Sequence, residues 1–208
     1  SSRGGSHVAA MTQEGRMFVL SGRDGAVLAS TMAHPEGSSI VTWDPDQWII
    51  YSAGIYGDVK RWRWDPESLT LRLDGETKLD TLGIWTISVS PDGAKVVIGG
   101  NESEAWLLDA QTLSGVRLAG HQGAIYASAF SPDGSRLVTG GFDNTTRIWE
   151  TATGAEVAVL HTHTFAVHGI ACDPTGQVLL TVAGDGLAVL RRGGAGQGAA
   201  LSWRPEDR

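Results

Sequence analysis

A short turn sequence recurs four times along this chain at nearly constant spacing. The four copies are Asp44-Pro45-Asp46-Gln47, Ser90-Pro91-Asp92-Gly93, Ser131-Pro132-Asp133-Gly134 and Asp173-Pro174-Thr175-Gly176, with first residues 46, 41 and 42 positions apart. A period of about 40 residues is typical of stacked repeats, because one unit alone buries too little apolar surface to fold. We therefore expect one array whose function lies on the surface that the stacked units present.

Each period contains signals for four short β-strands. The clearest unit spans residues 120–160, and its predicted strands are 125–131, 136–141, 145–150 and 156–160. Gly, Pro, Asp or Asn residues bound these segments, as in antiparallel hairpins. Four-stranded units with regularly spaced turns favour an all-β fold of the β-propeller type.

The same unit resembles a WD40 repeat. The residues that carry the resemblance are Gly120-His121, Ser131-Pro132-Asp133-Gly134, Thr139-Gly140-Gly141, Asp143 and Ile148-Trp149-Glu150, with Glu150 where the family usually has Asp. In that family a buried network of His, Ser or Thr, Asp and Trp holds each four-stranded blade. The resemblance assigns these roles to His121, Thr139, Asp143 and Trp149, whose polar groups need partners once they are buried.

The turn spacing places equivalent residues in the other units. A second complete network is expected from His34, Ser52, Asp58 and Trp64. The last unit has His163, Thr181 and Asp185, but Arg191 falls near the Trp position. In the third unit the positions hold Asp80, Ile98, Glu102 and Leu108, so the network is predicted to be absent there.

The N-terminal residues align with the later strands of a blade. Residues 5–10 match 134–139 as a second strand, 16–20 match the third strand, and 27–32 serve as the fourth. The expected division is a partial blade at 1–33 followed by complete blades at 34–79, 80–120, 121–162 and 163–208. This predicts an incomplete ring of about five blades, the first without its innermost strand.

Two interpretations of this incomplete ring remain. Propellers of the resembled family usually have seven blades, which implies that roughly 90 upstream residues are missing and that an upstream segment or a second chain completes the ring. The alternative is a five-bladed ring in which residues 201–208 supply the first strand, or in which that strand is not needed.

Composition excludes several classes of function. A net charge of -7 argues against nucleic-acid binding, which normally requires a broad basic face. We expect no membrane span, because no apolar run approaches the roughly 20 residues that cross a bilayer. Cys172 is the single cysteine, so no internal disulfide can form, and a cytoplasmic location is expected.

The residues that look catalytic or metal-binding have structural explanations. Ser or Thr, His and Asp recur together at each period, whereas a catalytic triad is a single site. His161, His163 and His168 could bind zinc, but His163 fills the network position, and no Cys or carboxylate has matching spacing. The glycine-rich segment 193–198 is predicted to join the last two strands, with 199–203 as the final strand. We therefore predict no enzyme activity in this chain, no cofactor and no metal.

The resemblance implies that partners dock on the top face of the propeller. Positions that usually point to this face are Ser39, Trp85, Tyr126 and His168, five residues after each His position, and Gly57, Asn101, Phe142 and Gly184, just before each Asp position. The predicted partner-binding residues are Trp85, Asn101, Tyr126, Phe142 and His168. The competing interpretation is that the aromatic residues among them pack against a neighbouring blade.

We expect a non-catalytic scaffold or sensor that binds a protein or peptide on its top face. It would be the C-terminal regulatory part of a larger signalling or effector protein. The alternative is the propeller part of a multidomain enzyme whose active site lies in a missing segment or a partner chain. A small-ligand or metal site in the central channel is a further alternative.

Overall fold

The computed structural model describes residues 2–37 and 39–192, and these residues form strands and turns with one short 3-10 helix, Arg3–Gly5. The chain divides into two compact units. Unit 1 contains residues 1–98 and 108–115, and unit 2 contains residues 99–107 and 116–208.

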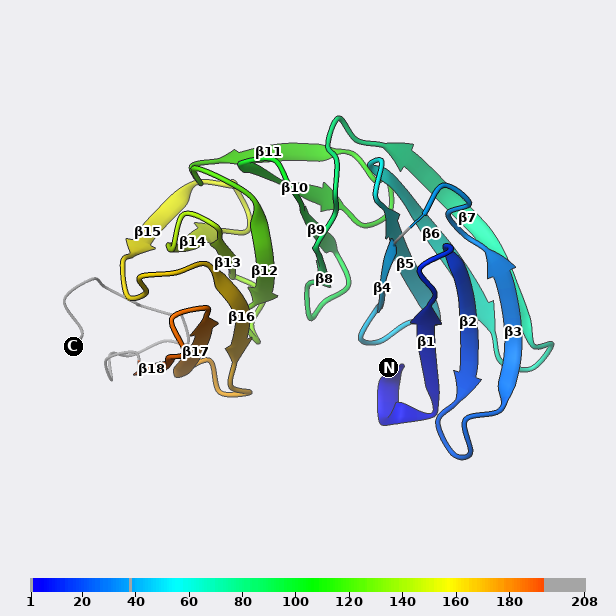
Figure 1. Cartoon of the computed structure of the whole chain (residues 1–208). Coiled ribbons are helices and arrows are strands. Elements are labelled where there is room, and N and C mark those ends of the chain that lie inside the picture. The colour runs from blue at the N-terminus through cyan, green and yellow to red at the C-terminus, as the bar shows by residue number, and fades with distance from the viewer. Residues whose placement is uncertain (1, 38, 193–208) are drawn as a thin grey trace. The chain divides into compact units, whose positions relative to one another are not determined.

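The described strands form five sheets in which consecutive strands are neighbours (Figure 1). The first sheet contains β1 (His7–Met11), β2 (Arg16–Ser21) and β3 (Val27–Met32), and the second contains β4 (Ser39–Trp43), β5 (Ile49–Gly54), β6 (Asp58–Asp65) and β7 (Thr70–Lys78). The third contains β8 (Thr86–Val89), β9 (Lys95–Gly99), β10 (Glu104–Asp109) and β11 (Gly115–Ala119), divided between the units. The fourth contains β12 (Ile125–Phe130), β13 (Arg136–Gly141), β14 (Thr146–Glu150) and β15 (Glu156–Leu160), and the fifth contains β16 (Val167–Cys172), β17 (Val178–Ala183) and β18 (Ala188–Arg192).

These sheets confirm the predicted all-β architecture of antiparallel four-stranded units. In the fourth sheet the strands differ from the predicted ones by a single residue at two ends, because β12 stops at Phe130 and β14 starts at Thr146. Apolar residues on facing strands fill the space between sheets; Val138, Ile148, Leu160 and Leu179 form one such buried cluster in unit 2. The predicted loop at 193–198, the predicted strand at 199–203 and the tail at 201–208 lie outside the described residues.

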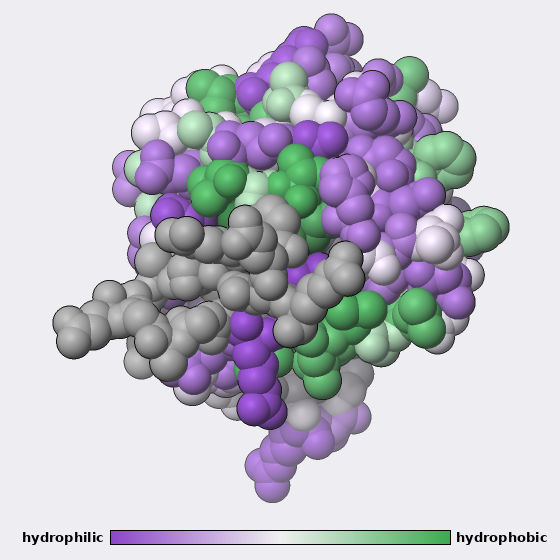
Figure 2. Space-filling view, turned by 90° about the vertical axis from the view of Figure 1, so that its left-hand side faces the viewer, coloured by the Kyte–Doolittle hydropathy of each residue, from purple (hydrophilic) through white to green (hydrophobic). Residues whose placement is uncertain are grey.

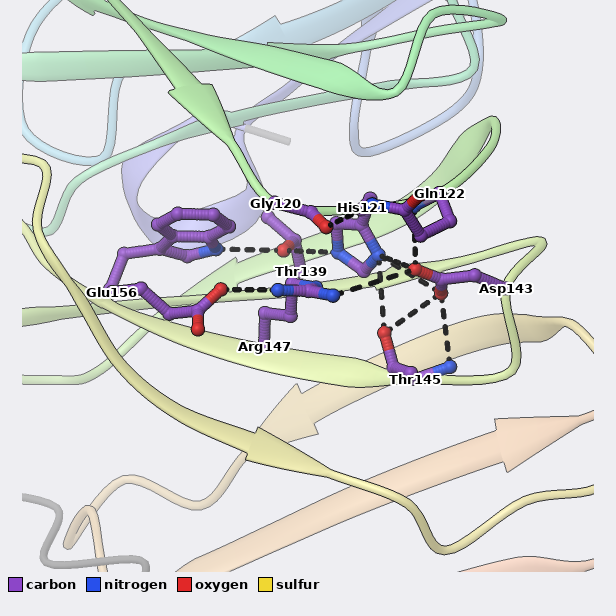
Figure 3. A network of polar contacts seen from close by, with 9 residues as sticks. Gly120, His121, Gln122, Thr139, Asp143, Thr145, Arg147 and Glu156 are labelled. Atoms are coloured by element: carbon purple, nitrogen blue, oxygen red, sulfur yellow. Dashed lines mark hydrogen bonds and ion pairs between the residues drawn. The ribbon is translucent and has the colours of Figure 1, made fainter.

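A buried polar network crosses the fourth sheet, as predicted (Figure 3). The indole N–H of Trp149 donates to the hydroxyl of Thr139 over 2.8 Å, and His121 Nε2 lies 2.8 Å from the same hydroxyl. His121 Nδ1 lies 3.0 Å from both carboxylate oxygens of Asp143. Since Thr139 Oγ1 accepts from the indole, its own proton can go to His121 Nε2, and Nδ1–H can donate to Asp143. The network therefore satisfies every member with a neutral histidine.

The fifth sheet has the same arrangement without a tryptophan. His163 Nε2 lies 2.8 Å from Thr181 Oγ1, and His163 Nδ1 lies 3.0 Å from Asp185 Oδ2. In the third sheet, Ile98 and Leu108 occupy the Thr and Trp positions, and both are fully buried. Apolar packing replaces the network there, as the sequence predicts.

The second sheet corrects one prediction. His34 bonds Ser52 and Asp58 as expected, but the indole that donates to Ser52 Oγ belongs to Trp62, at 2.9 Å, and not to Trp64. The hydroxyl residue and its tryptophan are ten residues apart in both networks. Asp58 follows Ser52 by two more residues than Asp143 follows Thr139, and Trp62 follows Asp58 by two fewer residues than Trp149 follows Asp143. A count from Asp58 that uses the spacing of the fourth sheet therefore arrives at Trp64 instead of Trp62. Trp64 is buried beside this network with no acceptor for its Nε1 among the described residues.

Burial sets the charge states of these networks. Desolvation lowers the pKa of His34 and of His121, which favours neutral imidazole in both. Burial alone would raise the pKa of Asp143, but the N–H of Gln122, the hydroxyl of Thr145 and His121 bond its carboxylate and lower the pKa overall. Each histidine thus acts as a neutral donor to an ionised aspartate.

We expect Thr139→Val to lower the free energy of unfolding by about 1–3 kcal/mol, because it leaves the buried Trp149 N–H without an acceptor. Thr139→Ser keeps the hydroxyl and should cost no more than about 1 kcal/mol for the lost methyl group. Urea unfolding monitored by circular dichroism measures both. Equal losses for the two variants would contradict the role given to the hydroxyl.

The two neighbouring tryptophans should respond differently to replacement by phenylalanine. Trp62→Phe removes the donor to Ser52, whereas Trp64→Phe removes an N–H that has no described acceptor. We expect Trp62→Phe to cost about 1 kcal/mol more in unfolding free energy than Trp64→Phe. Urea midpoints of the two variants test this, and a larger loss for Trp64→Phe would restore the original assignment.

Acidification should destabilise the chain through His34 and His121. Their lowered native pKa values mean that the unfolded state, with a histidine pKa near 6.5, takes up protons first as the pH falls. The stability that depends on neutral imidazole is therefore complete above about pH 6.5 and is lost progressively below it. Urea midpoints measured between about pH 7.5 and pH 5.5 should fall. The double variant His34→Gln/His121→Gln should show a flatter decline, and an unchanged slope would refute this explanation.

Candidate functional site

The Ser or Thr, His and Asp networks have triad-like geometry but no access to substrate. Ser52 and Thr139 are 0% exposed. Each hydroxyl already accepts an indole N–H, from Trp62 and Trp149 respectively. These groups are therefore structural, and a functional surface must be sought elsewhere.

Two of the predicted site residues, Tyr126 and His168, occupy equivalent bulges at the start of innermost strands. The pairing of β12 with β13 shifts between Ile125 and Ala127, and that of β16 with β17 shifts between Val167 and Gly169. A bulge redirects the side chain of its extra residue. The two redirected rings stack on each other, with centroids 5.1 Å apart and planes inclined by 23°. His168 is exposed and Tyr126 is half-buried.

Two phenylalanines lie in the loops beside this stack. Phe142 is 61% exposed and Phe165 is 63% exposed. A β-carbon at Gly123 would lie 3.1 Å from the ring of Phe142, and one at Gly184 would lie 3.5 Å from Cβ of Phe165 and 3.7 Å from His168 Nε2. Each ring therefore lies next to a glycine. Phe165 of the fifth sheet is equivalent in sequence to Gly123 of the fourth, and Gly184 of the fifth is equivalent to Phe142 of the fourth.

Backbone hydrogen bonds fix these loops to one another. Phe142 N–H donates to the carbonyl of Ala124 over 2.7 Å, and Gly184 N–H donates to Ala166 over 3.0 Å. The side-chain amide of Asn144 bridges to the carbonyl of Thr164 over 3.2 Å. We define Tyr126, Phe142, Phe165 and His168 as the aromatic rim of unit 2. Its side chains are exposed or half-exposed, but the backbone that carries them is bonded to the buried networks.

Two predicted residues lie outside this rim. Asn101 is exposed in unit 2, and the bond of 2.7 Å from Ile125 N–H to Gly100 places its turn beside the start of β12. Trp85 is exposed but belongs to unit 1, directly before β8. Leu82 and Tyr56 are exposed in the neighbouring loops of unit 1, which a bond from Gly83 N–H to Ile55 joins. Partner binding by the five predicted residues stays a prediction.

Sequence reasoning missed Phe165. It lies two residues after the network histidine His163, in a loop rather than at either of the positions that the resemblance marks. An aromatic residue in a polar loop was the available signal, because such a side chain has no core to enter. Tyr56 carries the same signal in unit 1.

Metal and thiol chemistry find no support at this surface. Within residues 2–37 and 39–192, no group of three or more His, Cys, Asp or Glu side chains is arranged to hold a metal ion. His163 is engaged with Thr181 and Asp185. Burial raises the pKa of the Cys172 thiol to about 11, so it stays protonated.

No helix among the described residues is long and apolar enough to cross a bilayer.

A cavity of about 700 Å³ in unit 1 has a polar lining that includes Tyr51, Arg61 and Asp74. Arg61 Nε bonds Asp74 over 3.1 Å, and its Nη1 donates to the carbonyl of Ala110 over 3.0 Å. The Tyr51 hydroxyl donates to the same carbonyl over 3.2 Å. The guanidinium of Arg61 is therefore already bound within the unit and does not present an anion site.

Exposed apolar side chains elsewhere are scattered. Val157 on β15 and Leu190 on β18 are examples from the outer strands. Figure 2 shows the face that lies at the left of Figure 1, where hydrophilic residues separate the visible apolar groups. Small separate groups of this kind are ordinary on protein surfaces.

Comparisons with known proteins agree with this geometry. A family model described as WD domain, G-beta repeat, matches residues 112–150 and 154–190. Coronin-7 from Bos taurus is 33% identical over 125 residues, a match that covers 59% of this chain and 12% of Coronin-7. A chain in a structure titled "Crystal Structure of Mitotic Checkpoint Complex" has a TM-score of 0.82 at 18% identity, and the match covers 92% of this chain and 60% of that one. The structural likeness concerns the fold alone.

The matched residues run from β11 through the fourth sheet and into β18, so they include the networks of the fourth and fifth sheets. Both of these networks follow the His, Thr and Asp pattern that the resemblance assigns. Residues 112–150 and 154–190 therefore match WD40 repeats, and the chain has the fold of a WD40-type β-propeller.

Proposed function

We propose that this chain is a non-catalytic interaction module that binds a protein or peptide segment at the aromatic rim of unit 2. The observation that carries the proposal is the stacked Tyr126–His168 pair flanked by two phenylalanines that are largely exposed. Aromatic side chains dominate binding hot spots, because they bury a large area with little loss of conformational freedom. WD40 propellers typically serve as protein-interaction scaffolds, which supports the same conclusion.

The rim is suited to binding because its backbone is already ordered. Phe142 directly precedes Asp143, whose carboxylate accepts the N–H of Gln122, and Phe165 directly follows Thr164, whose N–H donates to Asp185. A partner would therefore not have to order these loops on binding. Partner specificity would follow from the alternation of two large rings with Gly123 and Gly184.

The chain is proposed to be a regulatory part of a larger signalling or effector protein in the cytoplasm. Support for the larger context comes from the match to Coronin-7, of which the matched region is only 12%. The structural neighbour comes from a structure named for a complex, which is consistent with a role in assembly. The single, half-buried cysteine is compatible with a reducing compartment.

Selection of a random-peptide phage library on the immobilised chain tests the rim. An enriched peptide is labelled, and its affinity is measured by fluorescence anisotropy. We expect Phe142→Ala and Phe165→Ala each to weaken binding by about tenfold or more, because truncated hot-spot residues commonly cost over 1 kcal/mol. Their melting temperatures should change little, since both side chains are largely exposed.

Val157→Ala on the outer strand β15 is the matched control, since this residue is also apolar and exposed in the same unit. It should leave the affinity unchanged. Trp85→Ala reports separately on unit 1. If the peptide binds both phenylalanine variants as tightly as the original chain, the rim is not the binding surface.

A further inference from the structure

The polar cavity of unit 1 lies at the opposite end of the strands from the histidine network of the second sheet. In β5, Ile49 lines the cavity, whereas Gly54 at the other end of the strand lies beside the histidine and aspartate of the network. Three turns of unit 1 complete the lining, and they contain Asp44, Asp92 and Asp109. The volume of about 700 Å³ is within the range of roughly 300–1,000 Å³ that ligand sites occupy. The cavity is therefore large enough to bind a ligand of its own.

The lining of this cavity carries more negative than positive charge. Four aspartate carboxylates and two arginine guanidiniums contribute to it. Both guanidiniums bond the same carboxylate, because Arg61 Nε lies 3.1 Å and Arg63 Nη2 lies 3.3 Å from Asp74 Oδ2. The carboxylates of Asp44, Asp92 and Asp109 are thus left without an arginine, and the cavity has a negative charge that a bound cation would balance.

Asp44 is the most buried of these carboxylates, with an exposed fraction of 1%. Its Oδ1 accepts the N–H groups of Asp46 and Gln47, each over 2.9 Å, but no hydrogen-bond donor to Oδ2 is found among the described residues. A buried carboxylate without a cation beside it is unfavourable. The neighbouring Tyr51 reports the same negative potential, because burial first, and then the charge of Asp44, raise the pKa of its hydroxyl to about 12. A cation in the cavity would relieve this imbalance.

The other two carboxylates are also held in place by one oxygen each. Asp92 Oδ1 accepts the hydroxyl of Ser90 over 2.5 Å and the N–H of Ala94 over 3.0 Å. Asp109 Oδ1 accepts N–H groups of its own turn, and its Oδ2 lies 3.9 Å from Lys95 Nζ. Each carboxylate is therefore fixed in position before a ligand arrives and keeps Oδ2 to accept from it.

We propose that this cavity binds the guanidinium of an arginine side chain from a partner protein, with Asp44, Asp92 and Asp109 as its acceptors. A guanidinium suits the site better than an ammonium, because its donors lie in one plane and match carboxylate oxygens, and because it is more weakly hydrated. The cavity is much larger than a guanidinium, so it has room for the peptide groups on either side of the arginine. This site lies in unit 1 and does not depend on the aromatic rim.

The blocked tripeptide acetyl-glycyl-arginyl-glycinamide, titrated into the isotope-labelled full chain, tests the site by NMR. We expect it to shift the amide signals of Gln47, Gly93, Ala94 and Thr112, which line the cavity. The same tripeptide with citrulline in place of arginine has nearly the same shape without the charge, and it should leave these signals in place. Equal shifts from both peptides, or no shift from the arginine peptide, would overturn the proposal.

Two variants and a matched control locate the binding. Asp92→Asn and Asp109→Asn should each weaken binding of the arginine peptide by about threefold or more, because each removes a charged acceptor. Asparagine keeps an oxygen for the N–H groups of the turn. Asp65→Asn is the control, because Asp65 accepts the N–H groups of Glu67 and Ser68 in the equivalent turn of the second sheet but does not line the cavity. Equal affinities in all three variants would contradict the assignment.

Propylguanidine distinguishes an arginine of a partner chain from a free cation, because it carries the same single charge without peptide groups. It should bind more weakly than the arginine peptide, since it cannot use the rest of the cavity. Binding of propylguanidine as tight as that of the peptide would refute a protein as the source. Phe142→Ala, at the rim of unit 2, should leave the affinity for the arginine peptide unchanged, so the two proposals fail independently.

Discussion

In the second and fourth sheets, one buried hydroxyl serves two aromatic partners at once, and the polar interior of both sheets depends on this interaction. Thr139 receives the indole N–H of Trp149 and contacts His121 Nε2, and Ser52 does the same for Trp62 and His34. Because an unsatisfied buried donor is costly, all members must be in place together. The histidine and aspartate then extend the network to the loops, where Asp143 binds the N–H of Gln122. In the fourth sheet the core and the adjoining surface loop are thus coupled through one chain of hydrogen bonds.

The third sheet shows that the network is one solution to burial rather than a requirement of the fold. Ile98 and Leu108 fill the equivalent positions with apolar side chains and are fully buried. Replacing a polar network by well-packed apolar residues avoids the desolvation cost altogether. The polar solution gives something that the apolar one does not, because its aspartate carboxylate accepts an N–H of the adjoining loop, as Asp143 does from Gln122 and Asp185 from Thr164.

Much of the fold follows from the sequence, because turn residues and buried networks recur at fixed spacing. The predicted strands of the fourth sheet are nearly those observed, and His121, Thr139, Asp143 and Trp149 were assigned correctly. The error at Trp64 arose because the turn around Asp58 redistributes its residues while the strand register from Ser52 stays constant. Spacing measured along paired strands is reliable, whereas spacing measured across a turn is not.

Less of the candidate site than of the fold could be predicted from the sequence. Tyr126, Phe142 and His168 were identified from their positions, but the bulges that redirect Tyr126 and His168 have no sequence signal of their own. The stacking of one ring on another depends on the approach of two sheets that are separate in sequence. Phe165 was missed because its counterpart in the preceding sheet is Gly123, so the repeat gave no reason to look there.

The pairing of each exposed phenylalanine with a glycine has a consequence for how such a surface can diversify. A β-carbon at Gly123 would lie 3.1 Å from the ring of Phe142, close enough that the ring would have to shift, whereas one at Gly184 would be in ordinary contact with Phe165 and His168. The shape of this surface therefore depends on the absence of side chains at Gly123 and Gly184 as well as on the rings of Phe142 and Phe165. A single exchange of glycine for alanine could tilt one ring and change the contour offered to other molecules, while every hydrogen bond in the interior stayed intact.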